Sequence, residues 1–391
     1  LIIYLRGVKM KLNIGVIFGG KSVEHKISVI TALQAMDNID KEKYEVIPIY
    51  ITKDLVWYTG GMLRHIDSYK DFRLIDRYAT KVNLINKDGR FILQKSHGIK
   101  REINEIHLAF PIVHGKGVED GTIQGYLSTL GIPCVGSDVY ASALGQDKIF
   151  TKQLLEFNNI PVTDYVWFYD TDYLKDKDEL FKKINKLNYP LILKPARLGS
   201  SIGIEIINRK EELDNAINSS LDYDERFLIE EYIEKKREFN CAVMGTYNKI
   251  QTSAIEEVIN EEGICTYQDK YTLETSENPK IKKIYPIESP KELVKNIEEY
   301  STQTFRLLCA KGMLRVDYLY DTAKKKIYVD EVNIIPAYFS HHLWTDKNID
   351  YREIMDVLIK QAIDGVNHGK KLVLDNEILT NLKSKDVREL K

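Results

Sequence analysis

Two short segments in the C-terminal half of the sequence carry polar side chains at alternate positions. Arg315 and Asp317 lie two residues apart in "RVDY", and "DEVN" gives Glu331 and Asn333 the same spacing. Side chains two apart on a strand point to one face, so two strands paired through 321–326 would bring three oxygen ligands together beside an arginine. Carboxylate and amide oxygens suit Mg²⁺ or Mn²⁺, which often bridge to nucleotide phosphates. A surface salt-bridge ladder is the alternative interpretation.

The segment "LKPARLGSSIGI" is a second candidate site. Lys194 ends an apolar run, and Gly199, Ser200 and Ser201 follow in a turn. Such a turn can bring backbone N–H groups close to anionic oxygens, and the lysine adds a positive charge. The pattern is neither a P-loop nor a dinucleotide fingerprint, because the lysine precedes the glycine and a second strand follows. A plain hairpin turn with a surface lysine remains the other possibility.

Two glycine-containing loops near the N-terminus carry further candidates. In "FGGKSVEHKIS", Glu24 lies just past a strand–glycine–helix junction, and "HGKGVEDGTIQG" supplies His114, Glu119 and Asp120 after a later strand. Strand ends in α/β folds place ligand groups, so these side chains can face one crevice. A first-turn glutamate is also an ordinary helix-dipole residue, and the second loop can simply hold solvated acids.

The stretch "VDEVNIIPAYFSHHLW" raises the question of a histidine metal site. It places His341 and His342 next to each other after the carboxylates. Adjacent side chains on an extended chain point to opposite faces, and no cysteine lies near in sequence. A strand that runs into an active-site loop therefore explains this stretch better than a histidine metalloprotein.

The elements that must position these residues follow from hydrophobic periodicity. Apolar runs and period-two patterns predict strands, and apolar residues at helical spacing predict helices. Strand–helix alternation up to about Pro133 indicates an α/β N-terminal domain, and the later period-two strands indicate an antiparallel sheet. The predicted strands cover residues 12–18, 44–52, 105–113, 189–196, 200–207, 227–233, 237–245, 250–258, 313–321 and 325–333, and the helices 22–36, 121–131, 147–160, 210–218 and 291–310. Residues 259–284 are polar without a clear period, which is typical of a lid or binding loop.

Composition excludes several classes of protein. The chain has 391 residues, of which 43% are hydrophobic and 29% charged, as expected for two or three globular domains. Its net charge of −2 gives no electrostatic reason to expect nucleic acid or an anionic membrane as a partner. The four cysteines are widely spaced, as reduced thiols in a cytosolic protein would be. Residues 1–9 are interpreted as an extension ahead of Met10 and not as a signal peptide.

Taken in order, these motifs resemble the D-alanine–D-alanine ligase family of ATP-grasp enzymes, which includes the D-alanyl-D-serine and D-alanyl-D-lactate ligases of vancomycin resistance. The resemblance runs from about residue 12 to residue 345 and also includes "PCVGSDVYASALGQDK", "EEYIEKKREFNCAVMG" and "YQDKYTL". It implies an α/β three-domain ATP-grasp fold: a substrate-binding domain over 10–136, a central ATP-grasp subdomain over 137–230, and a catalytic domain with an antiparallel sheet over 231–377.

The resemblance also implies a role for each matching residue. The residues implied for ATP are Lys148, Lys194, Ser200 and Ser201 at the phosphates, Glu231 and Ile233 at the adenine, Glu238 at the ribose, and Lys270 at the γ-phosphate. Two Mg²⁺ or Mn²⁺ ions would be held by Asp317, Glu331 and Asn333. Glu24 would orient the first D-alanine in a network with Ser200 and Tyr271, and Arg315 would stabilise the oxyanion.

Several positions depart from the family pattern. The family usually has glycine at Val118, glutamate at Lys26, methionine at Gln146 and threonine at Phe339. Ala337 replaces a glycine whose backbone N–H helps form the oxyanion hole, and it can still offer that N–H if its φ is negative. His342 replaces the serine that binds the carboxylate of the second substrate. His114 and Leu343 complete the implied substrate residues.

The expected function is ATP-dependent joining of two D-alanines through an acyl phosphate, giving D-alanyl-D-alanine, ADP and phosphate for peptidoglycan. Tyr271 argues against D-lactate as the second substrate, and Leu343 matches the D-alanine enzymes, although "DKYTLE" is similar to the D-serine type. The alternatives are a D-alanyl-D-serine or other D-alanyl-amino-acid ligase, and a non-catalytic ATP-binding paralogue. The resemblance further implies a cytoplasmic homodimer that binds neither nucleic acid nor membrane.

Overall fold

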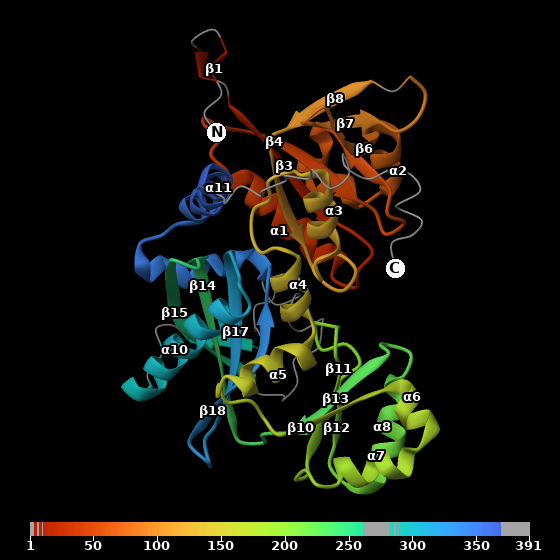
Figure 1. Cartoon of the computed structure of the whole chain (residues 1–391), viewed down its shortest axis with the longest axis vertical. Coiled ribbons are helices and arrows are strands. Elements are labelled where there is room, and N and C mark those ends of the chain that lie inside the picture. The colour runs from red at the N-terminus through yellow and green to blue at the C-terminus, as the bar shows by residue number, and fades with distance from the viewer. Residues whose placement is uncertain are drawn as a thin grey trace, which may run out of the picture.

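The computed structural model describes residues 4–5, 8–9, 11–99, 101–260, 281–284, 287 and 289–368. The seven-stranded sheet lies toward one end of the long axis of the molecule, and the five-stranded and four-stranded sheets both lie toward the other end (Figure 1). We propose that they mark three domains with boundaries near residues 136 and 230. A separate two-stranded sheet pairs β1 (Tyr4–Leu5) with β2 (Val8–Lys9).

The seven-stranded sheet has the order β8-β7-β6-β5-β4-β3-β9. Its strands are β3 (Leu12–Gly19), β4 (Tyr44–Ile51), β5 (Trp57–Thr59), β6 (Thr80–Lys87), β7 (Arg90–Lys95), β8 (Glu102–Ile106) and β9 (Leu108–Val113). The helical elements of this part are α1 (His25–Asn38), η1 (Gly61–Arg64), η2 (Ile66–Tyr69), α2 (Phe72–Tyr78) and α3 (Thr122–Leu130). Strands β4, β3 and β9 are parallel, as an α/β domain requires, whereas β5 to β8 form an antiparallel extension.

A glycine turn between β3 and α1 sets the position of Glu24. Gly19 and Gly20 have φ values of 91° and 95°. A Cβ on Gly19 would lie 2.2 Å from the carbonyl oxygen of Ile51, so the chain can turn this close to β4 only where no side chain is present. The turn places Glu24, which is the residue directly before α1, at the carboxyl ends of the parallel strands.

The four-stranded sheet is antiparallel, with the order β10-β13-β11-β12. Its strands are β10 (Tyr165–Tyr169), β11 (Leu191–Pro195), β12 (Glu205–Ile207) and β13 (Arg226–Glu231). One face is covered by α6 (Asp170–Lys175), α7 (Lys177–Ile184) and α8 (Leu213–Ser220), and η3 (Lys210–Glu212) precedes α8. The predicted pair of strands around the serine turn is present as β11 and β12, and Lys194 lies near the end of β11.

The five-stranded sheet is antiparallel, with the order β16-β15-β14-β17-β18. Its strands are β14 (Lys236–Thr246), β15 (Lys249–Asn260), β16 (Ile281–Ile284), β17 (Gly312–Asp321) and β18 (Lys326–Asn333). The predicted pairing of β17 with β18 is confirmed, with Asp317 opposite Glu331 and Arg315 opposite Asn333. Helices α4 (Val139–Gln146), α5 (Lys148–Phe157) and α10 (Lys291–Leu307) pack against this sheet.

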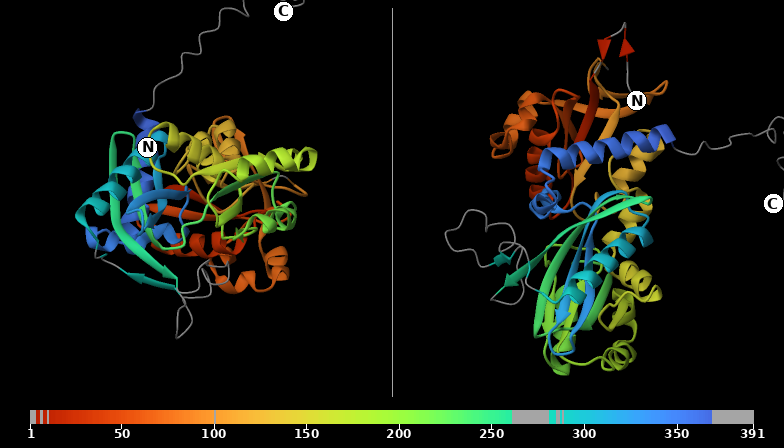
Figure 2. Two further views of the ribbon diagram at one scale, coloured as in Figure 1. Left: turned by 90° about the horizontal axis from the view of Figure 1, so that it is seen from below. Right: turned by 90° about the vertical axis from the view of Figure 1, so that its left-hand side faces the viewer.

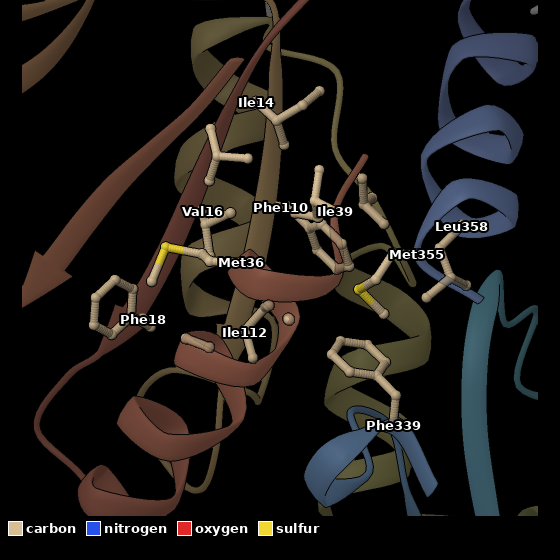
Figure 3. Packing of buried hydrophobic residues seen from close by; sticks show 14 of the residues in the cluster. Ile14, Val16, Phe18, Met36, Ile39, Phe110, Ile112, Phe339, Met355 and Leu358 are labelled. Carbon is tan, nitrogen blue, oxygen red and sulfur yellow. The ribbon is translucent and has the colours of Figure 1, made fainter. Parts of the chain in front are cut away.

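Residues 337–347 connect this sheet to the N-terminal core. They form η5 (Ala337–Lys347), which contacts both α1 and β15 and leads into α11 (Tyr351–His368). Phe339 is buried among Phe110, Met355 and neighbouring core residues of β3, β9 and α11 (Figure 3). Figure 2 shows α11 lying across the end of the five-stranded sheet beneath the N-terminal sheet. The core on this side therefore fixes the segment that carries the adjacent histidines.

Two findings bear on the expectations from composition. In the described part of the chain, no helix combines the length and apolar character needed to cross a membrane. Cys134, Cys241 and Cys309 are free thiols, and Cys265 lies outside the described residues.

Candidate active site

A cavity of about 480 Å³ lies between the five-stranded and four-stranded sheets. A smaller pocket adjoins it on the side of Glu24 and His114. The residues that line both are Lys148, Gly199, Arg315, Asp330, Glu331 and Ala337. The predicted residues that line one or both are Glu24, His114, Lys148, Lys194, Ser200, Ser201, Glu231, Ile233, Glu238, Arg315, Asp317, Glu331, Asn333, Ala337 and His342. The fold thus gathers most of the predicted site from three distant parts of the sequence.

Two of the predicted metal residues, Asp317 and Asn333, are hydrogen-bonded to each other beside Arg315. Arg315 donates from Nε and an Nη atom to the two oxygens of Asp317, at 2.6 and 2.8 Å. Asn333 Nδ2 lies 3.0 Å from Asp317 Oδ2. Burial disfavours the charge of Arg315, but the neighbouring Asp317 outweighs this effect and raises the pKa of the guanidinium. These residues are a cavity wall and not a surface salt-bridge ladder.

The donor set of the predicted metal residues fits a hard divalent cation. Asp317, Glu331 and Asn333 offer carboxylate and amide oxygens without sulfur or imidazole. Within the described residues, no group of three His, Cys, Asp or Glu side chains can hold a metal alone. A metal held here would therefore need further oxygens, which the phosphates of a nucleotide can supply.

Strand pairing extends this group of residues across the sheet. Asn240 on β14 pairs with Asp317 on one side and with Glu256 of β15 on the other, and Asp317 pairs with Glu331. Directly paired residues share a face of an antiparallel sheet. Glu256, Asn240, Asp317 and Glu331 thus form one polar row across four strands, of which the sequence motifs revealed only the last two members.

A β-bulge adds Asp330 to the same wall. Asp317 pairs with Glu331 but Tyr318 pairs with Val329, so Asp330 is the extra residue of the bulge. Both Asp330 and Glu331 line the cavity as a result. Asp330 Oδ1 accepts a hydrogen bond of 2.7 Å from Lys194 Nζ.

Lys194 belongs to a buried network of four charges. Its Nζ lies 2.6 Å from Glu230 Oε1. This contact is an ion pair, but its angles are not those of a hydrogen bond. Lys152 Nζ lies 2.7 Å from Glu230 Oε2, and both of these side chains are only 1% exposed. Asp330 completes the alternation Lys152–Glu230–Lys194–Asp330. The predicted phosphate lysine is therefore a positioned charge with two acidic partners, not a surface lysine.

Lys148 begins α5, and its side chain faces Glu331, one of the predicted metal residues. Its Nζ donates a hydrogen bond of 2.7 Å to the carbonyl of Leu198 and lies 3.4 Å from Glu331 Oε2. Asp147 caps the helix by accepting the backbone N–H groups of Ile149 and Phe150. This cap fixes the first turn, so the ammonium group reaches both the serine turn and β18.

The serine turn closes onto Glu24. Ser200 Oγ donates a hydrogen bond to Glu24 Oε1, as the expected network requires. Ser200 and Ser201 have φ values of 56° and 60°, a left-handed conformation that is uncommon for residues other than glycine. A Cβ on Gly199 would lie 3.2 Å from the Glu24 carboxylate, so Gly199 allows the turn to approach this side chain closely.

Two buried titratable groups lie behind Glu24. His114 Nε2 is 3.3 Å from Thr31 Oγ1, and burial lowers the pKa of His114 to about 4. Glu119 accepts backbone N–H groups from Gly115 and Ile335, each at 2.9 Å. Burial, assisted by the negative charge of Glu24, raises the pKa of Glu119 to about 8.

The raised pKa of Glu119 predicts a pH-dependent stability. The folded protein keeps a proton on Glu119 that the unfolded chain releases above its ordinary pKa of 4.5. The associated stability is present at low pH and is lost as the pH rises through about 8. Because glutamine does not titrate, we expect Glu119→Gln to remove this pH dependence of the free energy of unfolding. The stability of the variant relative to the wild type should therefore increase as the pH rises. Urea unfolding of both proteins at several pH values across this window measures the difference, and a constant difference would contradict the assignment.

The nucleotide end of the cavity holds the residues expected at the adenine and ribose. Glu231 Oε1 accepts hydrogen bonds from the backbone N–H and the Nδ2 of Asn188, at 3.0 and 2.6 Å. Glu238 forms an ion pair of 3.0 Å with Lys236. Ile233 also lines this end. These contacts hold the two carboxylates at the wall of the cavity.

The segment after β18 forms the opposite wall. Ala337 is not among the residues with positive φ, so it meets the expectation that a negative φ lets it offer its backbone N–H. The next three residues, Tyr338, Phe339 and Ser340, have positive φ values of 53°, 52° and 44°. His342 Nε2 lies 2.8 Å from Glu256 Oε2.

The two neighbours of His342 differ from it in position. The ring of His341 stacks on Tyr351, with 4.6 Å between centroids. Leu343 is fully buried in the core and is not among the described residues that line the cavity. The structure therefore does not bring Leu343 into the cavity wall, although the resemblance implied a substrate contact.

The predicted site and the observed site do not coincide fully. Lys270 and Tyr271 of the expected lid lie outside the described residues. The additional residues are Glu230, Asn240, Glu256 and Asp330. The alternation of polar and apolar residues in "NCAVMG" and "SAIEEV" is a weak signal for Asn240 and Glu256, and no local pattern indicates Asp330.

Most of the chain is similar to known proteins of one family. Residues 13–137 match the family model for the D-ala D-ala ligase N-terminus, and residues 154–360 match the model for its C-terminus. A D-alanine–D-alanine ligase from Thermosipho melanesiensis is 37% identical over 369 residues, with 94% of this chain and 98% of the relative covered. The relative from Thermosipho africanus is 38% identical, with 95% and 98% covered.

Solved structures of the same family have a similar fold. The VanG D-Ala:D-Ser ligase from Enterococcus faecalis has a TM-score of 0.77 and 30% identity, covering 90% of this chain and 100% of that one. The D-alanine–D-alanine ligase from Coxiella burnetii has a TM-score of 0.77 and 26% identity, covering 90% and 94%. The expected ATP-grasp fold is thus confirmed, and the chain belongs to the D-alanine–D-alanine ligase family.

Proposed function

We propose that this protein uses ATP to join two D-alanine molecules into D-alanyl-D-alanine, with ADP and phosphate as the other products, for peptidoglycan synthesis. Family membership over both domain models supports the activity. The observation that carries it is the convergence of Glu24, Ser200 and Arg315 at one pocket. Glu24 comes from the turn before α1, Ser200 from the turn between β11 and β12, and Arg315 from β17. The two amino acids and the nucleotide can therefore meet at this pocket.

The reaction needs positive charge around the transferred phosphoryl group. Lys148 and Lys194 supply it from the nucleotide side, and Arg315 from the sheet. Asp317, Glu331 and Asn333 would hold two Mg²⁺ or Mn²⁺ ions, which neutralise phosphate charge when bound. Glu24 and Ser200 would orient the ammonium group of the first D-alanine. The Ala337 N–H and Arg315 would stabilise the oxyanion that forms when the acyl phosphate is attacked.

The second amino acid would bind between Arg315 and the wall of Ala337 and His342. D-alanine is the proposed second substrate, because the relatives that match over nearly their full length are named D-alanine–D-alanine ligases. D-serine is the second candidate, since the VanG D-Ala:D-Ser ligase matches at 30% identity over 90% of this chain. His342 would contact this substrate.

Phosphate release with ATP, Mg²⁺ and D-alanine tests the proposed function. We expect release to depend on D-alanine and to match dipeptide formation mole for mole. Nucleotide binding without D-alanine-dependent release, under conditions where a known ligase is active, would instead favour a non-catalytic paralogue.

A panel of second substrates distinguishes the two acceptors. D-alanine, D-serine and D-lactate are each offered with labelled D-alanine, and the products are identified by mass spectrometry. We expect D-alanyl-D-alanine as the main product, and a predominance of D-alanyl-D-serine would reassign the acceptor. The same panel with His342→Ser shows whether this side chain sets the preference.

We further propose that the protein is a cytoplasmic homodimer. Light scattering after size exclusion measures its mass in solution, and a mass near 45.3 kDa would contradict the dimer.

A further inference from the structure

Glu256 and His342 form a carboxylate–imidazole pair at the edge of the cavity. Glu256 lies on β15, is 1% exposed, and receives hydrogen bonds on both oxygens. Asn240 Nδ2 donates to Oε1 at 2.9 Å, and His342 Nε2 lies 2.8 Å from Oε2. A buried carboxylate needs such partners, and here one of them is a half-exposed imidazole.

The hydrogen bond fixes which nitrogen of His342 carries a proton. Asn240 and His342 each bring an N–H group to a separate oxygen of Glu256, as suits an ionised carboxylate, which only accepts hydrogen bonds. His342 Nε2 must therefore be the donor. In the neutral ring, Nδ1 then holds a lone pair and can accept a proton. A carboxylate behind an imidazole holds this tautomer and stabilises the imidazolium that forms on protonation.

The surroundings of the pair suit an ammonium group. His342 lines the same cavity as Ala337 and Arg315, whereas Glu256 lies behind it. With the imidazole neutral, the pair carries one negative charge and attracts a cation. Arg315 also interacts electrostatically with Glu256, but its charge is already offset by a two-point contact to Asp317.

We propose that His342, held by Glu256, is the base that deprotonates the ammonium group of the second amino acid. The ammonium gives one proton to His342 Nδ1, and the freed nitrogen lone pair forms the bond to the acyl carbon. The bond from that carbon to the phosphate oxygen breaks. The second proton of the attacking nitrogen leaves on the released phosphate, and one hydrogen stays on the peptide nitrogen. Glu256 is the positioning residue in this step.

This inference rests on the proposed function, and hydroxylamine separates the two. Hydroxylamine is largely unprotonated at neutral pH and carries no carboxylate, so it attacks an acyl phosphate without a base. Hydroxamate formation with ATP and D-alanine therefore reports the first half-reaction alone. Its absence from the wild-type protein would overturn the proposed function together with this inference.

His342→Gln is the informative variant, because its amide can keep the hydrogen bond to Glu256 but cannot take a proton at neutral pH. We expect kcat for dipeptide synthesis to fall about 100-fold, while hydroxamate formation stays within about 3-fold. Glu256→Gln should lower the same kcat about 10-fold and spare hydroxamate formation in the same way. His97→Gln, an exposed histidine of the N-terminal domain, is the control and should change neither rate.

Three results would overturn the assignment. A His342→Gln protein with unchanged kcat and a raised KM for the second D-alanine would make His342 a binding group instead. Equal losses of dipeptide and hydroxamate formation would show that the variant damages the whole site. Unchanged kinetics in both variants would exclude any role for the pair in the reaction.

Discussion

Glu230→Gln is expected to destabilise the folded protein by about 3–5 kcal/mol, the usual cost of leaving a buried charge without its partner. Glu230 lies between Lys152 and Lys194, at 2.7 and 2.6 Å. Burial opposes its charge, but the two ammonium groups outweigh burial and lower the pKa of Glu230. Without the negative charge of Glu230, Asp330 is the one acidic group left in this network to balance the two buried lysines. Urea unfolding at neutral pH should measure the loss.

A second substitution tests whether charge balance is the cause. Lys152→Met keeps the volume of a buried side chain and removes the excess positive charge that Glu230→Gln creates. We expect the double variant to lose less stability than the sum of the single variants, by about 0.5–3 kcal/mol. Glu225→Gln is the control, because Glu225 is exposed and its ion pair with Arg197 lies at the surface. Additive losses, or a single-variant loss below about 1 kcal/mol, would contradict this account.

Much of the fold was predictable because its elements have strong local signals. Apolar runs ending in glycine gave β3 and the turn before Glu24, and Gly131 closes α3 in a left-handed conformation. The alternation in "RVDY" and "DEVN" placed Arg315 and Asp317 opposite Asn333 and Glu331 because β17 and β18 are joined by a short turn. Local periodicity is sufficient where strands that pair also follow each other in sequence.

The parts that were not predicted depend on long-range register. Simple alternation puts Asp330 on the opposite face from Glu331, and only the bulge turns both toward the cavity. Asn240 and Glu256 join the row only because β14 pairs with β17.

Phe339 was known only as a departure from the family pattern. Its aromatic ring packs against Phe110 in the core, at 5.7 Å between centroids, so the substitution serves packing and not the cavity.

The polar row also explains why one carboxylate should matter most for activity. Asp317 is paired with Glu331 on one side and Asn240 on the other, and it receives hydrogen bonds from Arg315 and Asn333. It is therefore both a proposed metal ligand and the anchor that aims the arginine. Loss of its charge weakens metal binding and releases Arg315 from its two-point contact in a single step.

We expect Asp317→Asn to lower the ligase rate roughly 10³-fold, which corresponds to about 4 kcal/mol of transition-state stabilisation. Manganese titration followed by electron paramagnetic resonance, with ATP present, should show weaker metal binding in the variant. Asp346→Asn, at an exposed position on η5, is the matched control and should retain both properties. If Asp317→Asn kept wild-type manganese affinity but lost activity, Asp317 would act through Arg315 alone. If it kept activity within about 10-fold, the metal assignment of this row would be wrong.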